Sequence, residues 1–274
     1  MVKGKRVFIS CDIEGITGVI GRDQAGSTGK DYERARRAMT ADVNAAIDGA
    51  LSAGATLVVV SDGHGSMQNL ILEDLNPAAE VVLGSPKPLT QMEGIGPDFD
   101  VAFFVGYHAR MGSPGVLSHT ISGSVVANVW VNGVLVGETG INAALAGRYG
   151  VPVGLITGDQ HVCAEARALL GELHTVEVKQ AITRYSARCL HPERTRDLIQ
   201  TAARTAVEGA ASLRPYVASS PVTFRIQFKD TGMTDSAVRV PNAVRIDPLT
   251  LEITDEDAAK AFIGLRAMIG LAQA

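Results

Sequence analysis

The stretch Val7-Phe8-Ile9-Ser10-Cys11-Asp12-Ile13-Glu14-Gly15 decides how the rest of the sequence is interpreted. It begins as an apolar strand and ends in two acids and a glycine. Residues two apart on an extended chain point to the same side, so Asp12 and Glu14 are expected to direct two carboxylates at one point. Ligands of open α/β sheets bind just beyond the carboxyl ends of strands. Two charges this close need compensation, and a metal ion would supply it. The alternative is a solvated turn.

A β-α-β unit is predicted for the first 60 residues. Residues 31–53 place apolar side chains at three- to four-residue spacing, which is typical of a helix, and Gly54 suits its C-cap. Residues 55–61 (Ala-Thr-Leu-Val-Val-Val-Ser) form a continuous apolar run. Such a run is typical of a parallel strand that is buried on both faces. The sequence therefore begins as an α/β fold with a mainly parallel sheet.

Polar side chains follow two further strands in the same way. Asp62-Gly63-His64-Gly65 ends the second strand, and Gly106-Tyr107-His108 follows the apolar run at 100–105. Taken alone, His64 is more easily explained as a turn histidine. Because the carboxyl ends of parallel strands meet at one edge of a sheet, three such ends together favour a shared metal site.

A predicted hairpin leads to a further acid. Residues 125–131 and 134–136 flank Asn132-Gly133, which is a strong turn signal. Glu138 follows the hairpin and precedes a predicted helix at 141–148. It is a fifth candidate for the site, although an acid in the first turn of a helix is also favoured by the helix dipole alone.

The pattern changes near residue 173. Half-exposed strands and amphipathic helices are expected beyond it, at 174–181, 192–213, 221–228, 244–253 and 255–272. Thr254 is the expected N-cap of the last helix. We therefore predict an α/β metal-binding catalytic domain in residues 1–173 and a smaller two-layer α+β domain in residues 174–274, packed against each other.

Composition argues against nucleic-acid binding, membrane association and secretion. The 25 basic and 29 acidic residues give a net charge of −4 without a basic run, so neither nucleic acid nor a membrane is an expected partner. Apolar runs such as 101–105 are far shorter than the roughly 18 residues of a membrane span. The N-terminal residues predict a first strand and not a signal peptide. The cysteines fit reduced, buried thiols of a cytoplasmic protein: Cys11, Cys163 and Cys189.

The candidate ligands are three carboxylates and two imidazoles, namely Asp12, Glu14, His64, His108 and Glu138. No Walker motif, H-E-x-x-H or G-x-S-x-G motif occurs. The ligand set suits Zn²⁺, and also Mn²⁺, Co²⁺ or Fe²⁺. Five ligands exceed the need of one tetrahedral ion, so a two-metal site bridged by Asp12 fits better and would activate a shared water for hydrolysis. His119 is left as a general base or acid, or as a group that stabilises an oxyanion.

Seven motifs carry a resemblance, in order, between residues 12 and 143. Two are Tyr32-Glu33-Arg34 and Met39-Thr40. The others are Asp12-Ile13-Glu14-Gly15-Ile16-Thr17-Gly18, Asp62-Gly63-His64-Gly65, Gly106-Tyr107-His108-Ala109-Arg110, Pro114-Gly115-Val116-Leu117-Ser118-His119 and Gly137-Glu138-x-Gly140-x-Asn142-Ala143. Weaker matches reach past residue 190. By these motifs the sequence resembles the D-aminopeptidases of the DppA type, peptidase family M55.

The resemblance implies a zinc-dependent aminopeptidase with two Zn²⁺ ions per subunit, with Mn²⁺ or Co²⁺ as alternatives. It implies that Asp12 bridges the ions, that Glu14 and His64 complete one, and that His108 and Glu138 complete the other. His119 matches the family's proposed catalytic histidine. The implied fold is a Rossmann-like three-layer α/β/α domain with a smaller α+β domain. Implied partners are short, D-Ala-D-Ala-like peptides and further copies of the chain in a ring-like homo-oligomer such as a decamer.

Other functions stay open from the sequence. The enzyme could prefer L-residues, because no residue reports the handedness of the substrate. It could be another dinuclear hydrolase, an amidase or a phosphoesterase, although Arg110 is the only basic residue close to a ligand motif. A third alternative is a peptide-binding or transport-associated protein with a structural metal. The spare His119 and the surplus of ligands weigh against that alternative.

Overall fold

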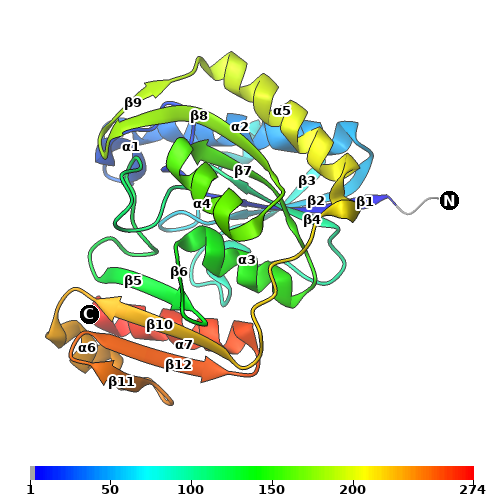
Figure 1. Cartoon of the computed structure of the whole chain (residues 1–274). Coiled ribbons are helices and arrows are strands. Elements are labelled where there is room, and N and C mark those ends of the chain that lie inside the picture. The colour runs from blue at the N-terminus through cyan, green and yellow to red at the C-terminus, as the bar shows by residue number, and fades with distance from the viewer. Residues whose placement is uncertain (1–3) are drawn as a thin grey trace.

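A seven-stranded sheet forms the centre of the computed structural model, which describes residues 4–274 (Figure 1). Its strand order is β3-β2-β1-β4-β7-β8-β9. The bounds are β1 Lys5–Cys11, β2 Ala55–Asp62, β3 Ala79–Val82, β4 Val101–Val105, β7 Val153–Asp159, β8 His174–Thr183 and β9 Ser186–Cys189. All neighbours pair in parallel except β8 and β9, which form an antiparallel hairpin. The predicted parallel sheet is confirmed.

Helices cover both faces of this sheet (Figure 1). On one face lie α2 (Tyr32–Ser52) and α5 (Pro192–Glu208), and on the other lie α3 (Glu138–Arg148) and α4 (Gln160–Leu170). Alternate residues of β1 separate into two cores, because side chains on a strand alternate between faces. Ile9 packs in the core of α2 and α5, whereas Phe8 packs in the core of α3 and α4. The three-layer α/β/α arrangement follows from this alternation.

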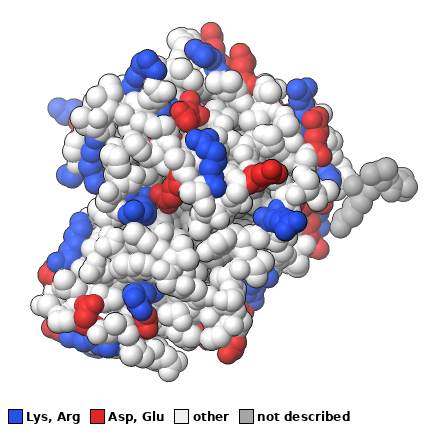
Figure 2. Space-filling model, in the orientation of Figure 1, with Lys and Arg blue, Asp and Glu red and all other residues white. Residues whose placement is uncertain are grey.

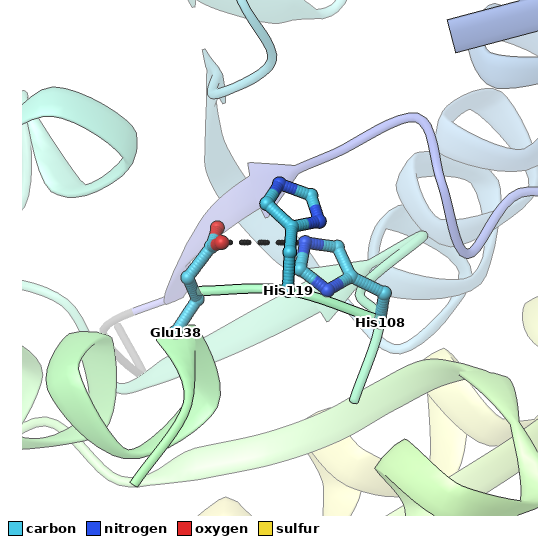
Figure 3. A group of neighbouring side chains, drawn as sticks. All are labelled: His108, His119 and Glu138. Carbon is cyan, nitrogen blue, oxygen red and sulfur yellow. Dashed lines mark ion pairs between the residues drawn. The ribbon is translucent and has the colours of Figure 1, made fainter. Parts of the chain in front are cut away.

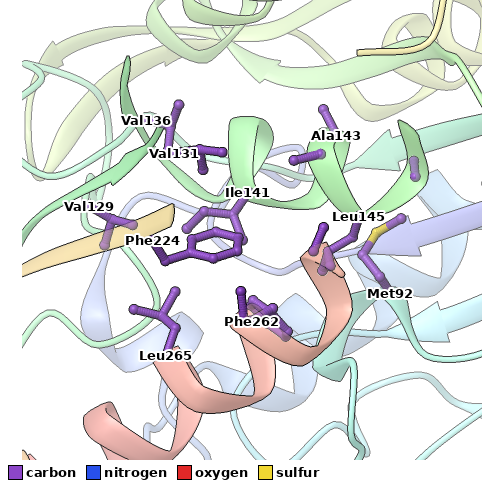
Figure 4. Packing of buried hydrophobic residues seen from close by; sticks show 14 of the residues in the cluster. Met92, Val129, Val131, Val136, Ile141, Ala143, Leu145, Phe224, Phe262 and Leu265 are labelled. Atoms are coloured by element: carbon purple, nitrogen blue, oxygen red, sulfur yellow. The ribbon is translucent and has the colours of Figure 1, made fainter. Parts of the chain in front are cut away.

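A second, antiparallel sheet has the order β11-β12-β10-β5-β6 among the described residues. Its strands are β5 Val126–Val131, β6 Val134–Val136, β10 Val222–Phe228, β11 Val244–Asp247 and β12 Thr250–Asp255. Helices α6 (Thr231–Ala237) and α7 (Ala258–Ala272) complete this layer. Ile141 and Leu145 of α3 pack with Phe224 of β10 and Phe262 of α7 in one buried cluster (Figure 4). Helix α3 therefore joins the two sheets through a shared core.

The two sheets do not divide at residue 173. Strands β8 and β9, which follow that residue, belong to the seven-stranded sheet, and β5 and β6, which precede it, belong to the five-stranded sheet. The half-exposed strand predicted at 174–181 corresponds to β8 of the seven-stranded sheet, and its alternation reflects a position near the sheet edge, next to β9. The division into domains at residue 173 remains a prediction. The boundaries of the two sheets do not coincide with it.

Two local expectations need correction, and the structure adds one short helix. The last helix begins at Ala258 with Asp257 as its N-cap, and Thr254 lies in β12. The loop after β1 contains a short helix, α1 (Arg22–Ala25). Cys189 is exposed at the sheet edge, although Cys11 and Cys163 are buried as expected.

Figure 2 shows acidic and basic side chains interspersed over the face in view. Within residues 4–274, no helix combines the length and apolarity needed to cross a membrane.

Candidate metal centre

Three neighbouring strand ends build the centre. Cys11, the last residue of β1, pairs with Asp62 of β2 on one side and with Val105 of β4 on the other. The order β2-β1-β4 makes this edge a point where the direction of strand addition reverses, and such points bind ligands in open α/β sheets. The segments that follow, which carry Asp12, His64 and His108, therefore leave the sheet side by side.

Backbone contacts hold these segments close together. The Asp12 amide donates to the Val105 carbonyl at 2.9 Å, and the Gly15 amide donates to the Gly106 carbonyl at 2.7 Å. A Cβ on Gly15 would lie 1.9 Å from the Tyr107 carbonyl oxygen, so only glycine fits. Gly106 has a φ of +76°, and its Cβ would lie 2.2 Å from the Asp12 carbonyl oxygen. The glycines that follow the strands thus allow the close approach of the segments that carry the candidate ligands.

Asp12 lies between two histidines. Its Oδ1 is 3.0 Å from Nδ1 of His64, and its Oδ2 is 3.5 Å from Nε2 of His108. Glu14 Oε2 lies 3.0 Å from the same His64 nitrogen, and Glu138 Oε1 lies 3.3 Å from the same His108 nitrogen. The five residues therefore form two groups that share one carboxylate, which is the arrangement a bridging ligand requires.

His119 completes the cluster. Its ring stacks on that of His108 with centroids 4.1 Å apart and an interplanar angle of 10° (Figure 3). Among the described residues, two triads have ligand atoms within 4.8 Å of one another: His108, His119 and Glu138, and Asp12, Glu14 and His108. The structure thus brings all six sequence-predicted site residues together, and their roles as ligands or catalyst remain predictions.

A backbone carbonyl orients each of the three imidazoles. His64 Nε2 lies 2.6 Å from the Ala25 oxygen, His108 Nδ1 lies 3.0 Å from the Ala109 oxygen, and His119 Nδ1 lies 2.9 Å from the Leu117 oxygen. A carbonyl oxygen can only accept, so each of these nitrogens carries the proton. In the neutral form of each ring the other nitrogen carries no hydrogen and can bind a metal or accept a proton.

Burial and neighbouring charges control the carboxylates. Burial, followed by the charge of Glu14, raises the pKa of Asp12 to about 7. Burial acts to raise the pKa of Glu14, but the charge and hydrogen bond of His64, with the charges of the other two histidines, together outweigh it and hold that pKa well below its usual range. At Glu138 burial acts in the same direction, but the charge and hydrogen bond of His108, with the charge of His119 and the Ile121 amide, together outweigh it and lower the pKa to about 2. Three buried acids in one place therefore demand nearby positive charge.

The histidines respond in opposite ways. Burial would lower the pKa of His64 and of His108, but the charges and hydrogen bonds of the neighbouring carboxylates together outweigh it. The pKa of His64 lies well above its usual value, and that of His108 rises to about 10. Burial, and then the charge of His108, lower the pKa of His119. Neutral His119 can thus accept a proton, while the other two histidines lie where the carboxylates attract cations.

The residues fit a resident metal. Glu14 Oε2 and His108 Nε2 are buried, and neither makes a hydrogen bond of acceptable geometry despite the nearby opposite groups. Buried polar atoms are normally satisfied, so an orphaned carboxylate oxygen and an orphaned imidazole nitrogen in one cluster of potential ligands indicate that a cation belongs there. Carboxylates with imidazoles suit zinc.

A buried amide supports the carboxylates, and sequence reasoning missed it. Gln91 Nε2 donates to Glu138 Oε2 at 2.7 Å and lies 3.3 Å from Asp12 Oδ2. Asn142 Nδ2 donates to Gln91 Oε1 at 2.5 Å and to the Tyr107 hydroxyl at 2.8 Å. Gln91 lies in the short helix η2 (Thr90–Met92), and no periodicity or motif distinguishes it. Asn142 lies in the motif Gly137-Glu138-x-Gly140-x-Asn142-Ala143 quoted above, and that motif could have pointed to it.

Lys179 of β8 fixes the backbone that carries Glu14. The lysine is 1% exposed, and its Nζ donates to the carbonyls of Glu14, Ile16 and Val19 at 2.6, 2.9 and 2.5 Å. It thereby closes the loop after β1 around one ammonium group.

Comparisons with known proteins agree with this site. The family model described as Peptidase_M55, D-aminopeptidase, matches residues 5–267. The chain belongs to peptidase family M55. A curated relative from Bacillus subtilis (strain 168), "D-aminopeptidase", is 33% identical over 268 residues, which cover 97% of each protein. A solved structure of the Zn-dependent D-aminopeptidase DppA from Bacillus subtilis, described as a self-compartmentalizing protease, matches with a TM-score of 0.95 at 33% identity and 98% coverage of both chains. The predicted family, fold class and enzyme class are confirmed.

Proposed function

We propose that this M55 enzyme is a zinc-dependent aminopeptidase that removes the N-terminal residue from short peptides, D-Ala-D-Ala-like peptides among them. The observation that carries the proposal is Asp12 between two imidazoles, with Glu14 and Glu138 on either side. The Zn-dependent relative and the D-aminopeptidase relative support the metal and the substrate class. The acidic surroundings also favour a substrate with a free, positively charged amino terminus.

Two zinc ions would be held by these residues: one by Asp12, Glu14 and His64, and the other by Asp12, His108 and Glu138. Bound there, zinc would lower the pKa of a water molecule and polarise the scissile carbonyl. Gln91 would hold the carboxylates of Asp12 and Glu138 in place through its amide.

His119 moves the protons in this proposal. Its Nδ1–H donates to the Leu117 carbonyl, which leaves Nε2 as the acceptor. The lowered pKa keeps the ring neutral at neutral pH, so Nε2 can take a proton from the attacking water. The same nitrogen then returns that proton to the nitrogen of the leaving amine as the peptide bond breaks.

The proposed assembly is based on the relatives, and the proposed location is based on the free cysteines. The self-compartmentalizing relative supports a ring-like homo-oligomer, for which a decamer is our expectation. The free cysteines among the described residues support a reducing, cytoplasmic environment.

The deciding experiment measures amine release from D-Ala-D-Ala and L-Ala-L-Ala in parallel, before chelation, after it, and after zinc is returned. Cleavage of the D-peptide alone, restored by zinc, is the expected result. Restored cleavage of the L-peptide alone would refute the D-preference and keep the aminopeptidase. Cleavage of neither peptide by zinc-loaded enzyme would reject the peptidase proposal in favour of phosphoesters or of binding without turnover.

Two variants test the assigned roles. Asp12→Ala should lose bound zinc, and a normal zinc content would refute the bridging role. His119→Ala should keep its zinc and lose about 10²–10⁴-fold in kcat. Full turnover of that variant would remove His119 from the mechanism.

A further inference from the structure

Two pockets flank the candidate metal centre. A pocket of about 240 Å³ lies on the Glu138 side and includes Arg266 of α7 in its wall. A larger pocket of about 530 Å³ lies on the other side, and its wall includes Glu14, His119, Arg22 and Arg184. Cavities of about 300–1,000 Å³ are typical of small-molecule sites, so the larger pocket can take the end of a short peptide.

Arg184 lines the larger pocket and has a buried side-chain nitrogen without a hydrogen-bond partner among the described residues. It lies in the turn between β8 and β9, and its carbonyl accepts from the Leu117 amide at 2.9 Å, so its backbone is tied to the loop that carries His119. The Nε atom of Arg184 is buried and makes no hydrogen bond with any described residue. A buried guanidinium nitrogen without a partner is costly, and a ligand that accepts from it would remove that cost.

Arg22 of α1 lies beside it. The guanidinium carbon atoms of Arg22 and Arg184 lie 5.6 and 5.8 Å from the centre of the Tyr185 ring, and Arg22 Nη2 donates to the Tyr185 hydroxyl at 3.0 Å. Figure 2 shows basic side chains gathered at the edge of the molecule where α1 and the end of the β8–β9 hairpin lie in Figure 1. Both arginines thus approach the same tyrosine ring and lie in the wall of the same pocket.

Neither arginine is neutralised. Among residues 4–274, no carboxylate lies within 4.0 Å of the Arg22 or the Arg184 guanidinium. Of the described residues that line the pocket, Glu14 is the one acid, and it faces His64. Two arginines that converge on a pocket without a counter-ion favour an anionic ligand, and their planar forks match a carboxylate.

We propose that the larger pocket binds the free C-terminal carboxylate of a short peptide, with Arg184 as the main donor and Arg22 as the second. This inference rests on the proposed aminopeptidase function and specifies its substrate as peptides with an unblocked carboxyl end. In the proposed mechanism His119 protonates the amine of the departing peptide. Because His119 lines the larger pocket, the departing peptide, which carries the C-terminal carboxylate, should lie in that pocket. Consecutive Cα atoms are about 3.8 Å apart, so only peptides of a few residues bring a carboxylate to this wall. The two arginines should therefore favour peptides of a few residues over longer ones.

The test compares Ala-Ala, of the handedness that the wild-type enzyme cleaves, with the same dipeptide amidated at its carboxyl end. We expect the wild-type zinc-loaded enzyme to have a kcat/KM about 10–100-fold higher for the free acid than for the amide. Arg184→Met should lower kcat/KM for the acid by about the same factor, mainly through KM, and leave the amide unchanged. Arg184→Lys should recover part of the loss, and Arg22→Met should show a smaller loss. Arg188→Met, which changes an exposed arginine of the same hairpin, is the matched control and should behave as wild type.

Several outcomes would overturn the inference. Equal kcat/KM for acid and amide in the wild type would show that the carboxylate is not recognised, and would leave the peptidase proposal intact. A loss in Arg184→Met that is equal for both substrates would mean a structural role only. Loss of the preference in Arg266→Met would place the carboxylate in the smaller pocket. Cleavage of neither substrate by the wild type would reject the peptidase proposal and this inference with it.

Discussion

Replacing Lys179 with methionine removes the ammonium group that closes the loop after β1. Methionine is of similar length and unbranched, so it fills most of the space but donates nothing. The carbonyls of Glu14, Ile16 and Val19 would each lose a donor in the interior of the protein. We expect a large loss of stability and a poorly fixed Glu14.

The magnitude follows from two opposing terms. Hydrogen bonds to charged groups contribute about 1.5–3 kcal/mol each, and Lys179 makes three. Against this, burial lowers the pKa of Lys179 from 10.5 to about 8. That shift corresponds to about 3 kcal/mol for keeping the charged form inside the protein. The difference leaves about 2–6 kcal/mol, so we expect Lys179→Met to lower the free energy of unfolding by about 4 kcal/mol.

Urea unfolding at pH 7 measures this loss, with both proteins treated with chelator so that metal binding does not contribute. Lys30→Met, at an exposed lysine, is the control and should stay within about 0.5 kcal/mol of wild type. A loss below about 1 kcal/mol in Lys179→Met would refute the assigned role of the three hydrogen bonds.

The pH dependence adds an independent check. Because the folded-state pKa of Lys179 lies below its unfolded value, its contribution is least favourable below pH 8 and improves as the pH rises towards 10.5. The difference in unfolding free energy between wild type and Lys179→Met should therefore widen by about 2 kcal/mol between pH 7 and 9.5. A constant difference would show that no buried charge is involved.

Three further perturbations have defined outcomes. Gly15→Ala places a Cβ 1.9 Å from the Tyr107 carbonyl oxygen, so the free energy of unfolding should fall by about 3 kcal/mol in urea, and a neutral result would refute the steric argument. Asp159→Ala removes an acceptor from the amides of Val116, His161 and Val162, at 2.7, 2.9 and 3.1 Å, and should cost about 2–4 kcal/mol by the same measurement, whereas an unchanged urea midpoint would mean that water replaces the carboxylate. Chelation should lower the Tm and added zinc should restore it, by about 3 kcal/mol of stability at 100-fold excess over Kd, and a Tm indifferent to both would argue against a resident metal.

The candidate site could largely be predicted from the sequence, because parallel strands bring their carboxyl ends to one edge. Asp12, His64 and His108 each follow an apolar run by a few residues, and the structure places their side chains within a few ångströms of one another. Glu138 could be placed because a hairpin signal and a helix start bracket it. These are local patterns, and the sheet topology converts them into a cluster.

The supporting residues could not be found in this way. Gln91, Arg184 and Arg266 lie outside the expected strand ends, in a 3-10 helix, a hairpin turn and a distant helix. Their approach to the site depends on tertiary packing that no spacing encodes. The domain division had the same weakness, because Asn132-Gly133 predicts a hairpin and is silent about which strand pairs with it. The partner of β5 is β10, from the far end of the chain.

That pairing has a consequence for the order of folding. Strands β5 and β6 cannot complete their sheet until β10 has been synthesised, after the whole of β7, α4, β8, β9 and α5. Contacts this distant in sequence form slowly, because a long segment of chain must be ordered before they provide any stabilisation. Glu138 directly follows β6, so a nascent chain carries Asp12, His64 and His108 well before this last acid is held in place. The candidate metal centre is therefore expected to be completed late, once the final strands have docked.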